Sequence, residues 1–210
     1  MLIICFGDSL TAGFQAPTRD SPMGQETPYG RFVQDLLGCR VIVQTSGVCG
    51  ELTGDMALRI RRDVVRHNPA YVPILGGTND LGWNVSPKEI LTNLVKMYEL
   101  VLAGGGHPVP VTVPSIRVEG YERSREGQEW VADHLARRDE LNGLILSHAA
   151  SAHLAAVDLF SATVDSGDGQ LVREYSNDGL HLSTAGYRVF AEHVADVLKP
   201  LLPMHCDGGS

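Results

Sequence analysis

The sequence predicts a single α/β domain in which helices cover both faces of a parallel sheet. Short apolar runs typical of buried strands alternate with longer segments whose apolar residues recur at helical spacing. Strands that alternate with helices in this way form βαβ units, whose strands are parallel. A chain of 210 residues is long enough for one such domain, so we assign residues 1–203 to it and expect 204–210 to be a disordered tail.

The composition excludes several classes of function. The net charge of −8 argues against a nucleic-acid surface or an anionic-membrane patch, because both need clustered lysine and arginine. We interpret the basic cluster Arg59, Arg61, Arg62 and Arg66 as the solvated face of a helix. No apolar run approaches the ~20 residues of a membrane span, and no signal peptide precedes the first strand. We therefore expect a cytoplasmic protein, unless a signal peptide has been removed.

The cysteines and histidines do not follow the spacing of a metal site. Cys5, Cys39, Cys49 and Cys206 include no Cys-x-x-Cys pair, so we expect free thiols. No glycine-rich loop ends in the Gly-Lys-Ser/Thr pattern that holds a phosphate. The sequence therefore calls for neither a metal nor a cofactor.

The first half of the chain predicts three strands with two helices between them. Thr27 and Pro28 suit the N-cap and the first position of a helix that Gly38 ends. Pro73 is unusual inside a strand, because proline has no N–H to donate to the sheet. In chain order we expect a strand at 2–6, a helix at 27–37, a strand at 39–43, a helix at 53–67 and a strand at 71–75.

The second half continues the alternation. Ser86, Pro87 and Glu89 have the spacing of a capping box with proline at the first helical position. Apolar residues at helical spacing then run as far as Gly104. In chain order we expect a helix at 87–103, a strand at 109–113, a polar loop at 115–129, a helix at 130–150, a strand at 155–160 and a helix at 184–198.

A serine follows the first strand directly. Gly7 permits a tight turn, and the short polar side chain of Asp8 favours one, so Ser9 lies at the rim of the sheet. Ligands of open α/β sheets bind at this rim, outside the carboxyl ends of the strands. Ordinary turn chemistry also accounts for these three residues. A nucleophilic serine needs in addition a base and a group that orients the base.

His181 is the candidate base among the eight histidines. It lies in a loop before the last helix, three residues after Asp178. The carboxylate can accept from one imidazole nitrogen while the other points at Ser9, as in a catalytic triad. The alternative is an exposed loop histidine beside a turn-forming aspartate.

Two further loops carry donors for an oxyanion hole. Gly50 has no side chain to keep a substrate from its N–H, and Asn79 can donate through its amide. The Ser9 N–H is a third donor. A simple turn and a loop cap are the alternatives for Gly50 and Asn79. If the sheet is parallel, all of these loops meet at one rim, where the donors can act together.

These residues resemble the four sequence blocks of the GDSL, or SGNH, hydrolase family. The blocks are Gly7-Asp8-Ser9-Leu10, Gly50, Gly77-Thr78-Asn79-Asp80 and Asp178-x-x-His181, and the resemblance covers about residues 2–200. It implies a flavodoxin-like three-layer α/β/α sandwich with a five-stranded parallel sheet. It also implies a metal-independent serine esterase or lipase-like acylhydrolase that needs no cofactor.

The resemblance assigns a role to each residue of the site. Ser9 is the nucleophile, His181 the general base and acid, and Asp178 the group that orients His181. The Ser9 N–H, the Gly50 N–H and the Asn79 amide form the oxyanion hole. Residues 45–50 depart from the Asn-x-Gly-x-Ser-Gly pattern common in the family. The resemblance therefore does not predict which hydrogen bonds hold that loop.

The expected reaction is hydrolysis of a carboxylic ester or thioester through an acyl-enzyme on Ser9. Phe14 and Trp83 are the candidate substrate-binding residues, and Met23, Tyr121 and Trp130 are near the same loops; core or lid packing is the alternative. Within the enzyme class, a carbohydrate O-acetylesterase competes with a thioesterase or lysophospholipase. A catalytically silent binding module of the same fold is the alternative from another class. The expected partner is a small-molecule ester, and the oligomeric state is left open.

Overall fold

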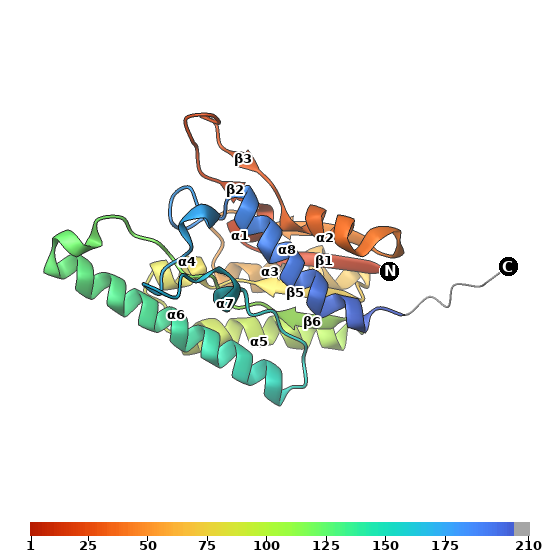
Figure 1. Cartoon of the computed structure of the whole chain (residues 1–210). Coiled ribbons are helices and arrows are strands. Elements are labelled where there is room, and N and C mark those ends of the chain that lie inside the picture. Colours follow the sequence, from red (N-terminus) through yellow and green to blue (C-terminus); the bar gives the residue numbers. More distant parts are fainter. Residues whose placement is uncertain (204–210) are drawn as a thin grey trace.

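A computed structural model describes residues 1–203, which form three layers (Figure 1). The expected tail at 204–210 and the Cys206 thiol lie outside the described residues. The middle layer is a parallel sheet, which confirms the predicted α/β class. Its strand order is that of the first four strands of a flavodoxin-like sheet. From edge to edge the strands are β4 (Ile42–Gly47), β1 (Leu2–Gly7), β5 (Tyr71–Leu75) and β6 (His107–Pro110).

The sheet has four strands, and the prediction of five is wrong by one. The segment expected as the fifth strand contributes a single parallel bridge, between Val111 and Val157. The next residue, Asp158, caps helix α7 (Leu159–Thr163) by accepting a hydrogen bond from the Ser161 N–H. An aspartate at this position starts a helix before the strand can extend.

Strand β1 is the centre of the core. Its residues from Ile3 to Phe6 are fully buried, and it pairs with β4 over six residues. On its other side it pairs with β5, and the two strands have the predicted bounds to within one residue. Pro73 lies opposite Val109 of β6 and has no register partner in β1, so the sheet tolerates a proline in this strand.

The long helices form the two outer layers. In Figure 1, α8 crosses in front of the strands and α3, drawn fainter, lies behind them. Helix α2 packs against α8, whereas α5 packs against both α3 and α6. The bounds are α2 (Tyr29–Leu37), α3 (Thr53–Asp63), α5 (Pro87–Ala103), α6 (Arg125–Ser151) and α8 (Thr184–Leu198).

Local capping residues set where several elements begin. The Ser86 side chain accepts from the Glu89 N–H and Pro87 is the first residue of α5, as predicted. Helix α6 begins five residues before its predicted start, because Ser124 accepts from the Gly127 N–H. The prediction that Thr27 is the N-cap of α2 is wrong, because Pro28 has that position. The Thr27 hydroxyl accepts a hydrogen bond from the Gln15 side chain.

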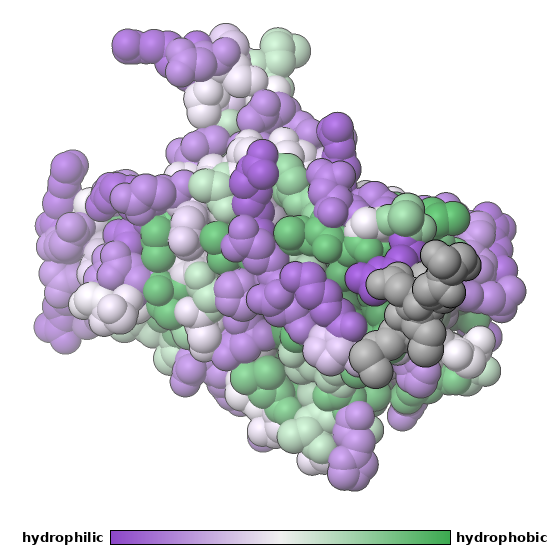
Figure 2. Space-filling model, turned by 45° about the vertical axis from the view of Figure 1, so that its right-hand side comes forward, coloured by the Kyte–Doolittle hydropathy of each residue, from purple (hydrophilic) through white to green (hydrophobic). Residues whose placement is uncertain are grey.

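The remaining elements are short. The small β2–β3 ribbon is at the base of a loop that projects from the body of the molecule, and Figure 2 shows a narrow, largely hydrophilic protrusion in this direction. Within residues 1–203 no helix has both the length and the apolar character that crossing a membrane requires. The short elements are α1 (Ser9–Ala12), β2 (Phe14–Gln15), β3 (Gln25–Glu26), α4 (Thr78–Gly82) and the 3₁₀ turns Gly38–Arg40, Val65–His67, Tyr121–Arg123, Arg173–Tyr175 and Lys199–Leu201.

Candidate active site

Ser9 is held at the carboxyl end of β1 by a turn formed by Gly7 and Asp8. A Cβ on Gly7 would lie 2.2 Å from Thr11 Oγ1 and 2.4 Å from the Leu75 carbonyl oxygen, so a larger residue is excluded. Asp8 Oδ1 accepts from the Leu10 N–H at 2.9 Å and thereby caps α1. Burial raises the pKa of Asp8 to about 7. Ser9 is the first residue of α1 and is 6% exposed.

The structure brings together the three residues that the sequence assigns to a triad. His181 Nε2 lies 3.2 Å from Ser9 Oγ, although 172 positions separate the two residues. His181 Nδ1 lies 2.8 Å from Asp178 Oδ2. The imidazole therefore bridges the hydroxyl and the carboxylate, which is the arrangement that general-base activation of a serine requires.

The Asp178 carboxylate is held in its ionised form. Burial opposes ionisation, but hydrogen bonds from the His181 ring and from the Leu180 and His181 backbone N–H groups lower the pKa of Asp178 to about 2. The two backbone bonds, both to Oδ1, are 2.9 and 2.8 Å long. The carboxylate thus orients the histidine through Oδ2 while Oδ1 closes the Asp178–His181 turn.

The proposed oxyanion donors lie on loops that are tied to one another. The Val48 N–H donates to the Gly7 carbonyl, which joins the Gly50 loop to the end of β1. Asn79 Nδ2 donates to the Glu51 carbonyl at 2.9 Å and keeps a second proton. The N–H groups of Ser9 and Gly50 have no hydrogen-bond acceptor among residues 1–203.

A buried arginine that was not predicted from the sequence holds this arrangement. Arg59, expected on a solvated face, is 7% exposed, whereas Arg61, Arg62 and Arg66 are exposed as predicted. Its Nη2 donates to the Gly7 carbonyl at 2.9 Å and lies 2.6 Å from Glu51 Oε2. Helical spacing places Arg59 between the buried Met56 and Ile60, and this was the signal that a charged residue points inward.

Asp80 is a second positioning residue whose role was not predicted. Its carboxylate, 2% exposed, accepts from the Thr53 hydroxyl at 2.6 Å and from the Thr53 N–H. Burial raises the pKa of Asp80, and the Thr53 hydrogen bonds oppose this shift. The contact joins the start of α3 to α4, and so fixes the Gly50 loop relative to Asn79.

Replacing Arg59 with glutamine should lower the free energy of unfolding by about 3 kcal/mol, because Glu51 then loses its buried partner. Urea denaturation followed by circular dichroism measures the change. The matched control is Arg62→Gln on the same helix, whose side chain is 66% exposed and pairs with Asp63. That variant should change the stability by no more than about 0.5 kcal/mol. Equal effects of the two substitutions would contradict the role assigned to Arg59.

A cavity of about 400 Å³ opens beside the triad. Asn79 and Asp178 line it, and so does Trp83, which is 77% exposed. Trp130 lines it as well and stacks on His134 with 5.0 Å between ring centroids. The cavity can hold part of a small substrate next to the reacting groups.

The other candidate substrate-binding residues lie elsewhere. Phe14 is outside the cavity lining and contacts the His181 ring edge to face, with 4.6 Å between centroids. Met23 is 94% exposed in the projecting loop, and Tyr121 does not line the cavity. Among the aromatic residues that were predicted to lie near the substrate, Trp83 and Trp130 therefore have the best position for contact with it.

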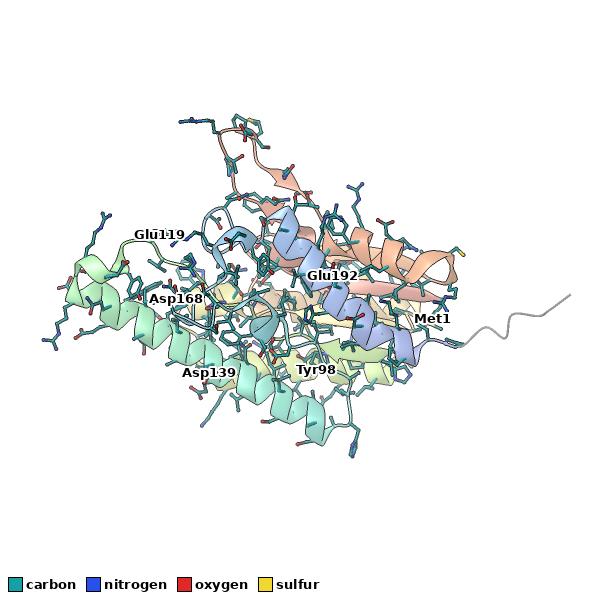
Figure 3. The ribbon with its side chains drawn as sticks, viewed as in Figure 1. Met1, Tyr98, Glu119, Asp139, Asp168 and Glu192 are labelled. Atoms are coloured by element: carbon teal, nitrogen blue, oxygen red, sulfur yellow. The ribbon has the colours of Figure 1, made fainter. Side chains whose placement is uncertain are left out.

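A second, polar hollow of about 530 Å³ adjoins this cavity, and Asp178 is among the residues that line both. Arg117, Glu119 and Arg173 are among its lining residues. Figure 3 shows Glu119 at the end of the molecule opposite Met1, where the loops after the strands gather. Arg173 pairs with Glu119, so the charges of this hollow are largely matched.

Comparisons with known proteins give a family match and curated relatives. Residues 5–189 match the model of the GDSL-like Lipase/Acylhydrolase family. An arylesterase of Vibrio mimicus is 31% identical over 114 residues, 53% of this chain and 54% of the relative. The uncharacterized lipoprotein YqeF of Bacillus subtilis is 30% identical over 125 residues, 56% of this chain and 51% of the relative. The chain spans about half the length of these curated relatives.

A solved structure matches nearly the whole chain. The lipase/acylhydrolase from Enterococcus faecalis is 26% identical, with a TM-score of 0.73 over 96% of this chain and 97% of that chain. This likeness supports the observed α/β architecture.

Proposed function

The chain belongs to the GDSL-like lipase/acylhydrolase family, and from this premise we propose that it is a serine hydrolase of carboxylic esters or thioesters. The observation that carries the proposal is the continuous contact from Asp178 through His181 to Ser9, with distances of 2.8 and 3.2 Å. The substrate is a small-molecule ester, and the scheme uses neither a metal nor a cofactor.

The reaction proceeds in two acyl transfers. His181 Nε2 takes the proton of the Ser9 hydroxyl while Oγ forms a bond to the carbonyl carbon of the ester. The tetrahedral adduct then expels the alcohol or thiol, which receives the proton from His181. Water enters, gives a proton to His181 and displaces Ser9, so the acid is released and the hydroxyl is restored.

Three donors face the oxygen that becomes negative in each step. The Ser9 and Gly50 N–H groups are free to donate, and Asn79 contributes the amide proton that Glu51 does not take. Such donors stabilise the transition state more than the ground state, because the charge is largest there. They therefore act mainly on kcat.

Replacing Asn79 with alanine should lower kcat by about 10²- to 10³-fold with little change in KM, since one oxyanion donor is lost. Initial rates on a p-nitrophenyl ester measure both constants. Gln128→Ala is the control and should leave kcat unchanged, because its amide also donates to a backbone carbonyl, at 3.0 Å to Glu122, but at the exposed start of α6. If Asn79→Ala raised only KM, the amide would bind the ground state instead.

A fluorophosphonate probe tests the nucleophile directly. The wild-type protein should gain one probe mass on Ser9, identified by peptide mass spectrometry, and Ser9→Ala should gain none. Covalent capture needs an activated serine, so it separates an enzyme from a binding module that merely keeps the fold. A wild-type protein that stays unlabelled would favour the binding module.

A series of esters with rising acyl length decides between the substrate classes. A cavity of about 400 Å³ with tryptophan walls suits a short acyl group or one sugar ring. Selective turnover of acetyl esters, including acetylated sugars, supports a carbohydrate O-acetylesterase. A preference for medium or long chains, or for acyl thioesters, supports a lysophospholipase or thioesterase.

We place the protein in the cytoplasm, as a proposal. The support is that no helix within residues 1–203 is long and apolar enough to cross a membrane. The lipoprotein among the relatives makes lipid attachment the alternative. Cell fractionation with an antibody to the native protein distinguishes the two locations.

A further inference from the structure

Arg138 is a buried cation that forms no salt bridge among residues 1–203, and it lines the cavity beside the triad. It is 1% exposed, and among residues 1–203 it makes no salt bridge within 4.0 Å. Taking a charge out of water is costly unless a partner compensates it. We propose that Arg138 binds a carboxylate of the substrate, so that the preferred substrates are esters that carry an acid group. This inference rests on the proposed esterase function.

The hydrogen bonds of Arg138 leave one donor group unused. Nη1 donates to the Pro114 carbonyl and contacts the Thr78 hydroxyl at 3.5 Å. Nε donates to His134 Nε2 at 3.1 Å. Nη2 has no acceptor among the described residues, although a guanidinium can donate five hydrogen bonds. The side chain is thus positioned by three neighbours and keeps donors for a ligand.

His134 is a second polar residue in the lining of the same cavity. A guanidinium nitrogen can only donate, so His134 Nε2 accepts and the ring proton is on Nδ1. Burial lowers the pKa of His134 to about 4, and the charges of neighbouring arginines add to this shift. Burial also lowers the pKa of Arg138, to about 9. At neutral pH the pair is therefore a cation beside a neutral imidazole.

The position of Arg138 links it to the reacting centre. Thr78, which Arg138 contacts, is the residue before Asn79, and both line the same cavity as Asp178. Trp83 and Trp130 form apolar walls for the carbon chain between the ester and the acid group. A carboxylate a few bonds from the scissile carbonyl can therefore reach the guanidinium.

The neighbouring arginine at this cavity is not available for such a role. Arg117 lies 2.9 Å from Asp168 and 3.5 Å from Asp165, so its charge is compensated within the chain. In Figure 3, Asp168 lies at the loop end of the molecule, away from Met1. Arg138, in contrast, has no carboxylate within 4.0 Å among the described residues, and the charge of Asp8 acts on it only from farther away.

Binding to the Ser9→Ala protein tests the subsite without turnover. Monomethyl glutarate and methyl valerate differ by a carboxylate in place of a methyl group on the acyl side; acetoxyacetate and ethyl acetate differ in the same way on the alcohol side. The two tryptophans of the chain both line the cavity, so NMR titration of their indole N–H signals reports binding there. We expect the acidic ester of at least one pair to bind about 10- to 100-fold more tightly.

The double variant Ser9→Ala/Arg138→Gln should lose this preference. Ser9→Ala/Arg125→Gln is the matched control and should keep it, because Arg125 is on the same helix with a side chain that is 89% exposed. If Arg138→Gln does not fold, Arg138→Lys replaces it and should keep a reduced preference. The inference is overturned if neither pair shows a preference, or if an Arg138 variant weakens both members of a pair equally. A wild-type protein that fluorophosphonate does not label would instead overturn the esterase function.

Discussion

Replacing Ser9 with alanine should lower kcat by at least about 10⁴-fold while the protein stays folded. The reason is that Ser9 Oγ is the atom 3.2 Å from His181 Nε2, and no other hydroxyl of the described residues contacts that nitrogen. The residual rate comes from the oxyanion donors, which the substitution leaves in place. Initial rates on p-nitrophenyl acetate, with circular dichroism as the check on folding, measure the effect.

The control for this experiment is Ser151→Ala. The Ser151 hydroxyl donates to a carbonyl within helix α6 and is exposed, so its loss should leave kcat unchanged. If Ser9→Ala kept more than a tenth of the wild-type kcat, the nucleophile would be another group. A direct attack by water, with His181 as the base, would then be the better mechanism.

Replacing Asp178 with asparagine should lower kcat by about 10⁴-fold through the wrong tautomer of His181. Asp178 Oδ1 accepts two backbone N–H bonds, so the asparagine oxygen stays there and the amide group replaces Oδ2. An amide donates to His181 Nδ1, which leaves the ring proton on Nε2, facing Ser9. The histidine can then no longer accept the serine proton.

The pH dependence of the wild-type protein checks the same assignment. The pKa of Asp178 is lowered to about 2, so its contribution to stability is present above the pKa of the unfolded carboxyl and is lost as the pH falls through about 2. An acid limb of kcat/KM above pH 4 therefore does not belong to Asp178.

The control for Asp178→Asn is Asp168→Asn. Asp168 is an acidic residue outside the triad that pairs with Arg117, so this variant should keep the wild-type rate. Equal losses in the two variants would point to a general effect of charge.

Most of the fold was predictable because its signals are local. The apolar run after Met1, the Ser86-Pro87 start of α5 and the last helix each follow from residues within one or two turns of the chain. The fifth strand was predicted wrongly for a related reason. Its apolar residues suit a strand, but Asp158 favours a helix start, and the competition between them is decided by packing.

The sequence by itself determined which groups are available for chemistry. Ser9, Gly50 and Asn79 are identifiable as candidates because they follow strands and suit a nucleophile and oxyanion donors, whereas Asp178 and His181 are candidates through their Asp-x-x-His spacing.

Only the tertiary structure decided how those groups are held and what else lies beside them. Arg59 and Arg138 are arginines on helices, and nothing within their own helices states that the first clamps the end of β1 or that the second lines the cavity. Burial and partnership depend on contacts between segments far apart in the chain. A local pattern indicates at most which helix face points inward, as for Arg59 between Met56 and Ile60, and it does not identify the partner across the fold.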